Sequence, residues 1–272
     1  MPGDGEMNPS CGELMSKLEL RRVGELIMRR LNKGGSPPKL AAFVANNPSA
    51  TWSVIRKNGS RYAQIRKFLF EDQQSLCAYC EIRLIIDESN PDSSDFRVEH
   101  FHPKSPHVVP PNYAAMWLNM LGCCHGGAHK SVPQPGRFSA PDLSCDALKA
   151  NQNLVGVILN PLSDFIGSDM LFSFSVDGSI SVSPSCPGAL QASAGETIVH
   201  LGLDSNRLRR LRREAIEATL DAIADLNSSG VDLEEACTIL FPNQAPPEFY
   251  SCMRSVLGAV AEARLTQLNY YQ

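Results

Sequence analysis

The hydrophobic pattern of the chain is mostly helical, because apolar residues recur every three or four positions over long stretches. In the first stretch, Leu20, Val23 and Ile27 fall on one face, and the basic residues lie largely off it. Turn-forming Gly, Pro, Asn and Ser residues separate the stretches. The pattern predicts helices over residues 13–31, 39–46, 59–76, 189–200, 204–226 and 248–268.

Alternation of apolar and polar residues, which is typical of strands, is clearest over residues 171–183. The alternation is interrupted at Asp177-Gly178, a dipeptide that favours a two-residue type I′ turn. This segment is therefore predicted to be a β-hairpin. Shorter strands are predicted over residues 98–101 and 155–159.

Residues 77–152 are rich in Cys, His, Pro and Gly and contain few periodic runs. A small module stabilised by metal has this composition, because the metal takes the place of a large core. We expect a helical N-terminal region (1–75), a metal-stabilised module (76–152), and a C-terminal region with a hairpin and helices (153–272). The predicted fold class is α+β.

The composition is that of an ordinary globular protein, with 43% hydrophobic and 20% charged residues. No apolar run approaches the roughly 20 residues needed to cross a bilayer. The first residues are acidic and do not have the basic and apolar regions of a signal peptide. We therefore expect a cytoplasmic protein with no membrane partner.

The net charge of −4 is unevenly distributed along the chain. Residues 1–67 hold 12 Lys and Arg against 5 Asp and Glu, and a second basic cluster runs from Arg207 to Arg213. A local basic patch can follow a phosphate backbone even in a net-acidic protein. For either cluster alone, a solvated helix face is the more ordinary interpretation.

Cys77 and Cys80 have the Cys-x-x-Cys spacing that supplies half of a tetrahedral zinc site. We favour Cys124 and Cys145 as the other two ligands, because a long loop between ligands adds little to the closure cost. Three neighbouring residues are alternative ligands: Cys123, His125 and His129. The other cysteines are expected to be small buried hydrophobes in a reducing compartment: Cys11, Cys186, Cys237 and Cys252.

A carboxylate and an imidazole stand side by side at Glu99-His100. A neutral imidazole at His100 can take a proton from water, and a carboxylate at Glu99 can hold a hard cation such as Mg²⁺. Hydrolysis of a phosphodiester needs both an activated water and positive charge near the developing oxygens. The pair alone is weak evidence for this chemistry, because a surface Glu-His pair without a role is common.

The order of the motifs resembles that of the HNH nuclease family, which has the ββα-metal fold. The family pattern is Cys-x-x-Cys, Asp-His, an Asn, a Cys, and then a His or Asn followed by a Lys. The matching segments here are Cys77-Ala78-Tyr79-Cys80, Glu99-His100, Asn119 and Cys145-Asp146-Ala147-Leu148-Lys149. The resemblance implies a central zinc-stapled ββα-metal module with helical flanks.

The resemblance also implies a role for each matching residue. His100 matches the general base, and Glu99 and Asp146 match the ligands of a catalytic Mg²⁺ or Mn²⁺ ion. Asn119 matches the residue that orients the base and braces the loop, and Lys149 matches a basic residue that faces phosphate or the edge of the fold. The family's usual Asp is Glu99 here and its usual His or Asn is Asp146, but both substitutes are oxygen ligands that suit these ions.

Two residues after the Glu-His pair are expected to contact nucleic acid, namely His102 and Lys104. His102 is also the reserve candidate for the general base. Neither residue has a fixed position in the family pattern.

A narrower resemblance over residues 38–220 is to the HNH subunit of the Septu anti-phage system, which is also found in some retron loci. Two of the segments that carry it are Val98-Glu99-His100-Phe101-His102-Pro103-Lys104-Ser105 and Ile158-Leu159-Asn160-Pro161. It implies an antiviral effector that cuts nucleic acid and acts with a partner ATPase of the SMC/ABC-like type. DNA is expected before RNA as the substrate.

Two other functions fit part of the pattern. A zinc-stapled nucleic-acid-binding or scaffolding module would use the four cysteines but leave Glu99, His100 and Asp146 without a role. A zinc hydrolase would place catalysis at the Cys/His cluster, although such sites keep an open position and favour His ligands. The three polar residues in family order favour the nuclease.

Overall fold

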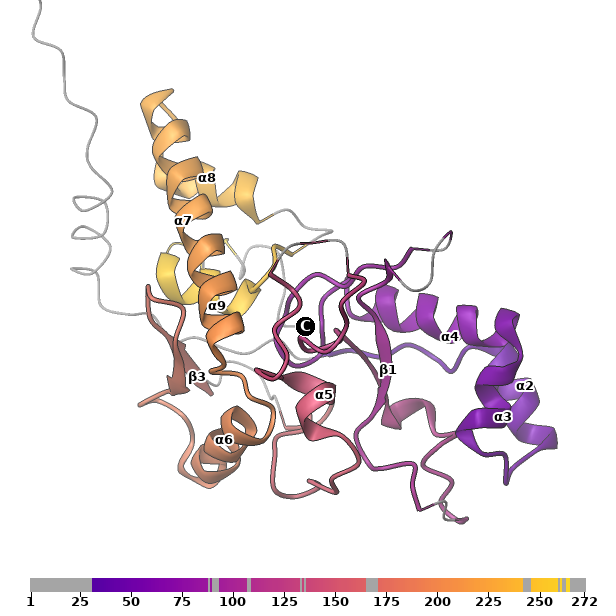
Figure 1. Ribbon diagram of the computed structural model, residues 1–272. Helices are drawn as coiled ribbons and strands as arrows, with labels where there is room; N and C mark the ends of the chain where they lie inside the picture. The colour runs from indigo at the N-terminus through magenta and orange to yellow at the C-terminus, as the bar shows by residue number, and fades with distance from the viewer. Residues whose placement is uncertain are drawn as a thin grey trace, which may run out of the picture.

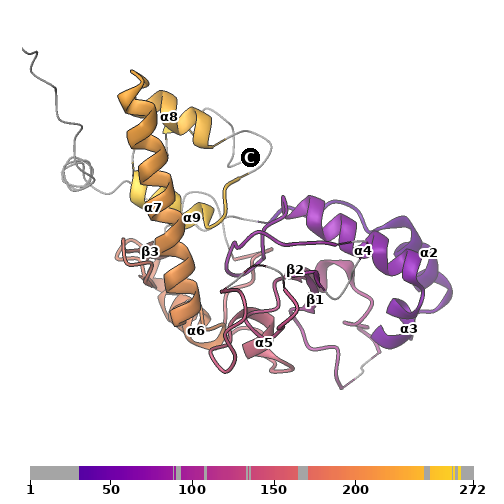
Figure 2. The ribbon, with the colours of Figure 1, turned by 45° about the horizontal axis from the view of Figure 1, so that its top comes forward.

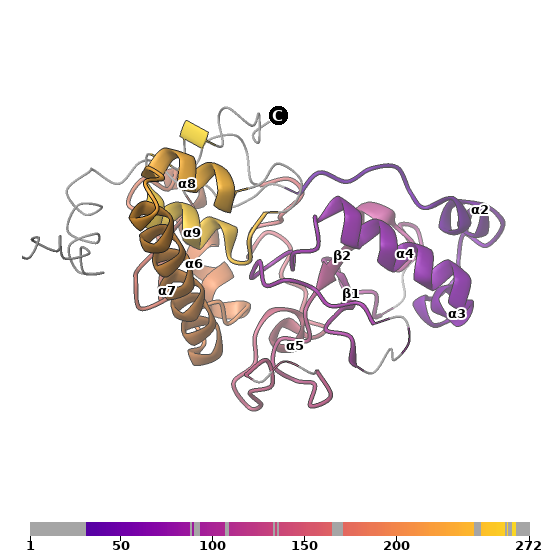
Figure 3. The ribbon, with the colours of Figure 1, turned by 90° about the horizontal axis from the view of Figure 1, so that it is seen from above.

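A computed structural model describes residues 31–264 of the chain, except for residues 88, 90–92, 107–108, 133, 135, 165–170, 242–245, 259 and 261–262. The helix predicted over residues 13–31 lies outside the described residues, Leu31 apart, and so does Cys11. Two groups of helices stand on either side of a small central module (Figure 1). The same division is seen from above in Figure 3.

The N-terminal group consists of α2 (Pro38–Asn46), α3 (Trp52–Lys57) and α4 (Gly59–Asp72). Helix α2 begins with a proline, whose missing N–H costs nothing at the first helical position. The Asn58 side chain caps α4 by accepting a hydrogen bond from the backbone N–H of Arg61. The sequence pattern did not predict α3, because six residues are too few to show a helical period.

Helix α4 ends at Asp72, before the predicted end at residue 76. Gln74 and Ser75 take up left-handed backbone conformations that a helix cannot continue. The preceding Gln73 is buried and hydrogen-bonds the backbone of Gly122 with both ends of its amide, at 2.6 and 2.8 Å. This side chain therefore fixes the end of α4 against the central strands.

The central module contains β1 (Arg97–His100), the 3₁₀-helix η2 (Trp117–Asn119), β2 (Met120–Cys123) and α5 (Cys145–Lys149). The two strands are antiparallel and pair Glu99 with Leu121. They lie between α4 and α5 (Figure 2). The predicted strand at Val98–Phe101 is thus confirmed, shifted by one residue.

The C-terminal region contains a second hairpin, β3 (Phe172–Phe174) and β4 (Ile180–Val182), followed by four helices. The helices are α6 (Gly188–His200), α7 (Asn206–Ser228), α8 (Leu233–Leu240) and α9 (Tyr250–Leu257). The Ser205 side chain caps α7 by accepting a hydrogen bond from the Leu208 N–H. Helix α8 was not predicted.

Two strand predictions need correction. The hairpin has no two-residue type I′ turn, because its tight turn spans residues 175–178 and Gly178 alone has a left-handed backbone. This arrangement is typical of a three-residue connection, in which glycine follows the turn. The strand predicted over residues 155–159 is wrong, since Val155 and Ile158 form only an isolated bridge around a turn.

Buried polar contacts join the C-terminal region to the central module. The Glu81 carboxylate accepts hydrogen bonds from the backbone N–H and hydroxyl of Ser251, at 2.8 and 2.7 Å. Arg137 forms ion pairs with Asp95 at 2.8 Å and with Glu248 at 3.0 Å. Both contacts bring residues far apart in sequence together, so they fix the start of α9 against the central module.

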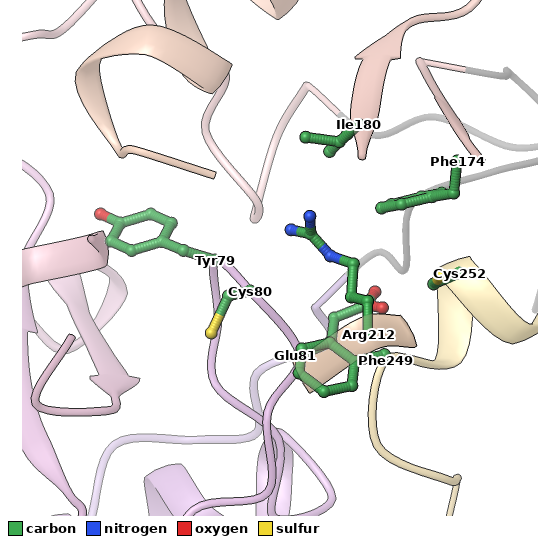
Figure 4. A pocket seen from close by; sticks show the side chains of 8 residues that line it. All are labelled: Tyr79, Cys80, Glu81, Phe174, Ile180, Arg212, Phe249 and Cys252. Atoms are coloured by element: carbon green, nitrogen blue, oxygen red, sulfur yellow. The ribbon is translucent and has the colours of Figure 1, made fainter. Parts of the chain in front are cut away.

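A small cavity lies within this joint, around the guanidinium group of Arg212 (Figure 4). Arg212 donates hydrogen bonds to the backbone oxygens of Gly178 and Leu203, at 3.0 and 2.7 Å. The cavity volume of about 10 Å³ admits about one water molecule. It is therefore too small to be a substrate site.

None of the helices in the described part of the chain combines the length and the apolar character needed to span a bilayer.

The buried ion pair between Arg137 and Asp95 yields a stability prediction. Asp95→Ala should lower the free energy of unfolding by about 3–5 kcal/mol, because it leaves a buried guanidinium without its closest anion. Glu71→Ala is the control, since it removes an exposed ion pair with Lys67 and should change stability by less than about 0.5 kcal/mol. Urea unfolding curves measure both, and equal shifts would contradict the prediction.

Candidate functional site

The thiols of Cys77, Cys80, Cys124 and Cys145 meet in one buried cluster, with all four sulfur atoms within 4.8 Å of one another. The Cys77–Cys145, Cys80–Cys124 and Cys124–Cys145 sulfur distances are 4.0, 3.7 and 3.9 Å. In a tetrahedral site with Zn–S bonds of about 2.3 Å, the sulfur atoms are about 3.8 Å apart. The structure thus brings these four thiols together, and their spacing fits a structural zinc ion.

A buried arginine lies next to the thiol cluster. Arg207, at the start of α7, donates a hydrogen bond to the Ser144 hydroxyl at 2.6 Å, but its buried Nε and Nη1 atoms have no hydrogen-bond partner among the described residues. Burial lowers the pKa of Arg207, and the negative charge of Cys124, Cys80 and Cys145 outweighs it, so the net shift is upward. A metal bound by four thiolates carries net negative charge, which this guanidinium would balance.

The alternative zinc ligands lie near the cluster but outside the group of four sulfur atoms. Cys123 is buried in β2, directly before Cys124. His125 lies at 3.4 Å from the backbone oxygen of Phe96 through its Nε2 atom, and its ring meets His129 edge-on at 4.6 Å. Cys186, Cys237 and Cys252 are buried elsewhere, as expected of small hydrophobes.

The carboxyl groups of Glu99 and Asp146 meet beside β1. Burial, together with a hydrogen bond and the negative charge of Asp146, raises the pKa of Glu99 to about 8. Lys149 opposes this shift, because its ammonium group lies 2.6 Å from the Glu99 carboxylate. Asp146 in turn pairs with Arg97 at 2.9 Å. Two carboxyl groups in contact share a proton, and a divalent cation with oxygen ligands could take its place.

Lys149 is one of the most buried side chains in the described part of the chain, with 1% of its surface exposed. Besides Glu99, its ammonium group donates a hydrogen bond to the backbone oxygen of His100 at 3.2 Å. Lys149 therefore holds the Glu99 side chain and the His100 backbone in place. Its predicted contact with nucleic acid stays a prediction.

The His100 ring packs between Ala114 and Trp52. Its Nε2 atom is 3.3 Å from the backbone oxygen of Ala114, and because a carbonyl only accepts, Nε2 carries the proton in this contact. The buried Nδ1 atom then holds a free lone pair, with no hydrogen-bond partner among the residues that the structure describes. Burial, followed by the positive charge of Lys104, lowers the pKa of His100 to about 3, so the ring is neutral at neutral pH.

Asn119 braces the loop that follows His100. Its side-chain oxygen accepts a hydrogen bond from the His102 N–H at 2.7 Å, and its amide donates to the backbone oxygens of His102 and Tyr113 at 3.0 and 2.8 Å. The His102 ring stacks on Tyr113 with a centroid distance of 4.1 Å. Asn119 thus lies where it would fix the loop between β1 and β2, as the resemblance implies.

A cleft of about 360 Å³ opens in front of Asp146. Its lining includes four cations: Arg56, Arg66, Arg97 and Lys104. Three aromatic rings also face it: Trp52, Tyr62 and Phe96. Trp52 connects the cleft to His100, because its ring meets the His100 ring edge-on with a centroid distance of 4.6 Å. Glu99 and His100 are buried and are not among the residues that line the cleft.

The basic cluster on α7 has a structural role. Arg207 and Arg212 are buried, and the other three arginines pair with carboxylates. These pairs are Arg209 with Asp204, Arg210 with Glu214, and Arg213 with Glu217. This helix therefore offers no group of unpaired cations to a phosphate backbone.

Comparison with known proteins identifies one curated relative. The chain is 28% identical over 254 residues to an Escherichia coli protein named "Retron Ec83 putative HNH endonuclease". The match covers 85% of this chain and 93% of that protein. No family model matches the chain. The predicted resemblance to HNH endonucleases and to retron proteins is thus confirmed, and the relative supports an enzyme of the endonuclease class.

Several residues of the site escaped the sequence analysis. Arg97 precedes the Val98-Glu99-His100 segment directly, and its pairing with Asp146 depends on the strand meeting α5. Tyr62 had only helical periodicity to mark it, and Trp52 lies in α3, which the pattern did not predict. Arg56 and Arg66 belong to the basic excess of residues 1–67, which was the one signal that pointed to them.

The neighbours Cys123 and Cys124 give a test of the zinc ligands in which the two variants differ by one position. Cys124→Ala should lower the zinc content from about one ion per chain and destabilise the central module, because structural zinc binding contributes folding free energy. Cys123→Ala should keep the zinc. Elemental analysis of both purified variants measures the metal, and zinc loss in Cys123→Ala alone would mean that the ligand assignment is wrong.

Proposed function

We propose that the protein is a metal-dependent endonuclease that hydrolyses phosphodiester bonds of nucleic acid. The observation that carries the proposal is the Glu99–Asp146 carboxyl pair together with the adjacent His100, whose Nδ1 atom holds a free lone pair. The cleft in front of Asp146 supplies a basic approach for a phosphate group. The relative's name supports the same reaction class.

His100 is proposed to act as the general base. Its Nδ1 atom would take a proton from the attacking water, while the Ala114 carbonyl keeps the proton on Nε2. A phosphate bound nearby would add negative charge, which raises the pKa of the imidazole and improves it as a proton acceptor. Because Nδ1 is buried, water reaches it only when a neighbouring group moves, and the Trp52 ring is the neighbour that also lines the cleft.

Glu99 and Asp146 are proposed to hold the catalytic cation. A bound Mg²⁺ or Mn²⁺ ion supplies positive charge that stabilises the transition state and the leaving oxygen of a phosphodiester. Lys149 positions Glu99 through their ion pair, and Arg97 positions Asp146. Zinc has a separate role in this proposal, since the four thiols lie in a buried cluster and stabilise the module.

Lys104 and His102 are proposed to contact nucleic acid on the loop after β1. DNA is placed before RNA as the substrate. Following the resemblance to Septu and retron proteins, we further propose that the enzyme is an anti-phage effector that works in the cytoplasm with a partner ATPase. The relative's name, which refers to a retron, supports the defence setting.

One observation favours a second function. His100 is 2% exposed and its Nδ1 atom is covered, which is also what a structural histidine in a non-catalytic nucleic-acid-binding module would show. Such a module would bind nucleic acid in the basic cleft without cutting it. Cleavage by the purified protein separates the two functions.

The first prediction concerns the base. His100→Ala should lower the rate of nucleic-acid cleavage with Mg²⁺ or Mn²⁺ by about 10²–10⁴-fold, because the proton acceptor is lost. His102→Ala should have a smaller effect, since the His102 ring stacks on Tyr113 and is not part of the Glu99–Asp146 pair. Cleavage of end-labelled substrates measures both, with zinc content as the check on folding. A His100→Ala enzyme that cuts normally would rule out the base assignment.

The second prediction concerns the cation. Asp146→Asn should raise the Mn²⁺ concentration needed for half-maximal cleavage at least tenfold, because an anionic ligand becomes neutral. The zinc content should stay the same, since Asp146 is not one of the four thiol ligands. Asp164→Asn is the matched control, because it makes the same change outside the cleft. An unchanged metal requirement in Asp146→Asn would contradict the ligand assignment.

A further inference from the structure

The helices that precede the thiol cluster build one wall of the cleft. Helix α3 contributes Trp52 and Arg56, and α4 contributes Tyr62 and Arg66, each pair four residues apart. Residues at this spacing share one face of a helix, so both helices direct an aromatic ring and a cation toward the same space. This wall belongs to neither the zinc cluster nor the carboxyl pair.

The cleft has a surplus of positive charge. Arg97 is balanced by Asp146, whereas Arg56, Arg66 and Lys104 have no carboxylate within ion-pair distance among the residues that the structure describes. In a chain with a net charge of −4, this local surplus attracts anions to the cleft. A phosphate group next to the carboxyl pair would be such an anion.

Arg66 is held in a way that leaves a donor free. Its guanidinium carbon lies 5.3 Å from the centroid of Phe96 and 5.9 Å from that of Tyr62, and its Nη2 donates to the Ser94 hydroxyl at 3.2 Å. Its Nε atom is buried and has no hydrogen-bond partner in the described part of the chain. A cation fixed between rings, with an unused donor, suits a phosphate or a base edge.

The aromatic rings of the wall do not cover one another. Trp52 meets Tyr62 at an interplanar angle of 73° and His100 at 76°, so neither neighbour lies parallel to the indole plane. Trp52 is also partly exposed. An unpaired base can stack on such a ring, whereas the bases inside a duplex already stack on each other.

We propose that Trp52 and Tyr62, with Arg56 and Arg66, form a binding site for an unpaired nucleotide, so the favoured substrate is single-stranded nucleic acid. The cleft volume of about 360 Å³ is in the range of small-ligand sites, at about 300–1,000 Å³. The base stacks on the wall, and the adjoining phosphate lies toward Asp146 and Lys104. This site deepens the proposed nuclease function and rests on it for the scissile bond.

Binding is tested without cleavage, in buffer with no added catalytic metal. Short labelled oligonucleotides of DNA and of RNA, each single-stranded or as a blunt duplex, are titrated with the zinc-containing protein, and anisotropy gives the dissociation constants. For DNA, for RNA or for both, the single strand should bind at least about tenfold more tightly than its duplex, because only unpaired bases can stack on the wall. Comparison of the DNA and RNA dissociation constants then shows which of the two nucleic acids the site prefers.

Tryptophan emission reports stacking directly, since the chain has 2 tryptophans and Trp117 is buried. Single strands should quench the emission of the wild-type protein. Trp52→Phe should keep binding within a fewfold but lose the quenching, because it retains a ring. Tyr62→Ala should weaken binding to single strands about tenfold, by loss of a stacking surface. Phe138→Ala is the control, as an exposed ring that does not line the cleft.

Arg56→Gln provides a second test that does not alter the packing of the wall, since Arg56 is exposed. It should weaken single-strand binding and reduce the salt dependence of log Kd by about one unit, as expected for one lost phosphate contact. Arg213→Gln, on α7, is its control and should leave both values unchanged.

Two results would overturn the site: a duplex that binds as tightly as the single strand, or binding that leaves Trp52 emission unchanged. These outcomes differ from failure of the nuclease proposal. Normal quenching with cleavage that survives His100→Ala would leave the nucleotide site standing and remove the proposed base. If cleavage depends on His100 but Trp52 emission shows no stacking, the proposed base would stand and the nucleotide site would be removed.

Discussion

The meeting of four thiols from three separate segments is the constraint on which the central module depends. The Cys77–Cys80 turn, the residue after β2 and the first residue of α5 all end at one point, within 4.8 Å. The strands of this module have only four residues each, too few to bury a core of their own. A metal at the thiols would replace that core and hold α5 across β1 and β2. Arg207 extends this constraint to α7, because the negative charge of the thiolates stabilises its guanidinium group.

The carboxyl pair follows from the same constraint. Cys145 is a metal-ligand candidate and Asp146 is the next residue, so anchoring the first also places the second beside Glu99. Lys149 lies one turn later on α5 and reaches the Glu99 carboxylate at 2.6 Å. The short helix therefore carries a structural ligand, a proposed catalytic ligand and a positioning cation within five residues. Loss of the thiol cluster should consequently remove the proposed site along with the fold.

The flanking regions complete the site from opposite sides. The N-terminal helices supply the aromatic and basic wall of the cleft and the Trp52 ring over His100. The C-terminal region holds the other side through buried contacts such as Glu81 with Ser251 and Arg137 with Glu248. The closed position of His100 is thus a property of the N-terminal wall rather than of the strand hairpin. The proposed binding in the cleft and access to the proposed base involve the same side chain, Trp52.

The sequence by itself determined the local features of this protein. Periodicity predicted α2, α4, α6 and α7 within about four residues, but the helix predicted over residues 248–268 ends at Leu257, before the left-handed backbone of Gly258. The Cys-x-x-Cys spacing with Cys124 and Cys145 predicted the thiol cluster. Such features depend on residues whose spacing along the chain encodes their geometry. The weakest predictions were short elements: α3 and α8 were missed, and the strand over 155–159 does not form.

Only the tertiary structure decided which side chains face one another. Nothing in the spacing of Lys149 indicated that it would be buried against Glu99, or that Arg97 would pair with Asp146. The α7 arginines resembled a basic surface but proved to be buried or paired with carboxylates, while Arg56 and Arg66 proved to line the cleft. The physical reason is that burial and ion pairing depend on contacts between distant segments, which a residue's own neighbours along the chain do not specify.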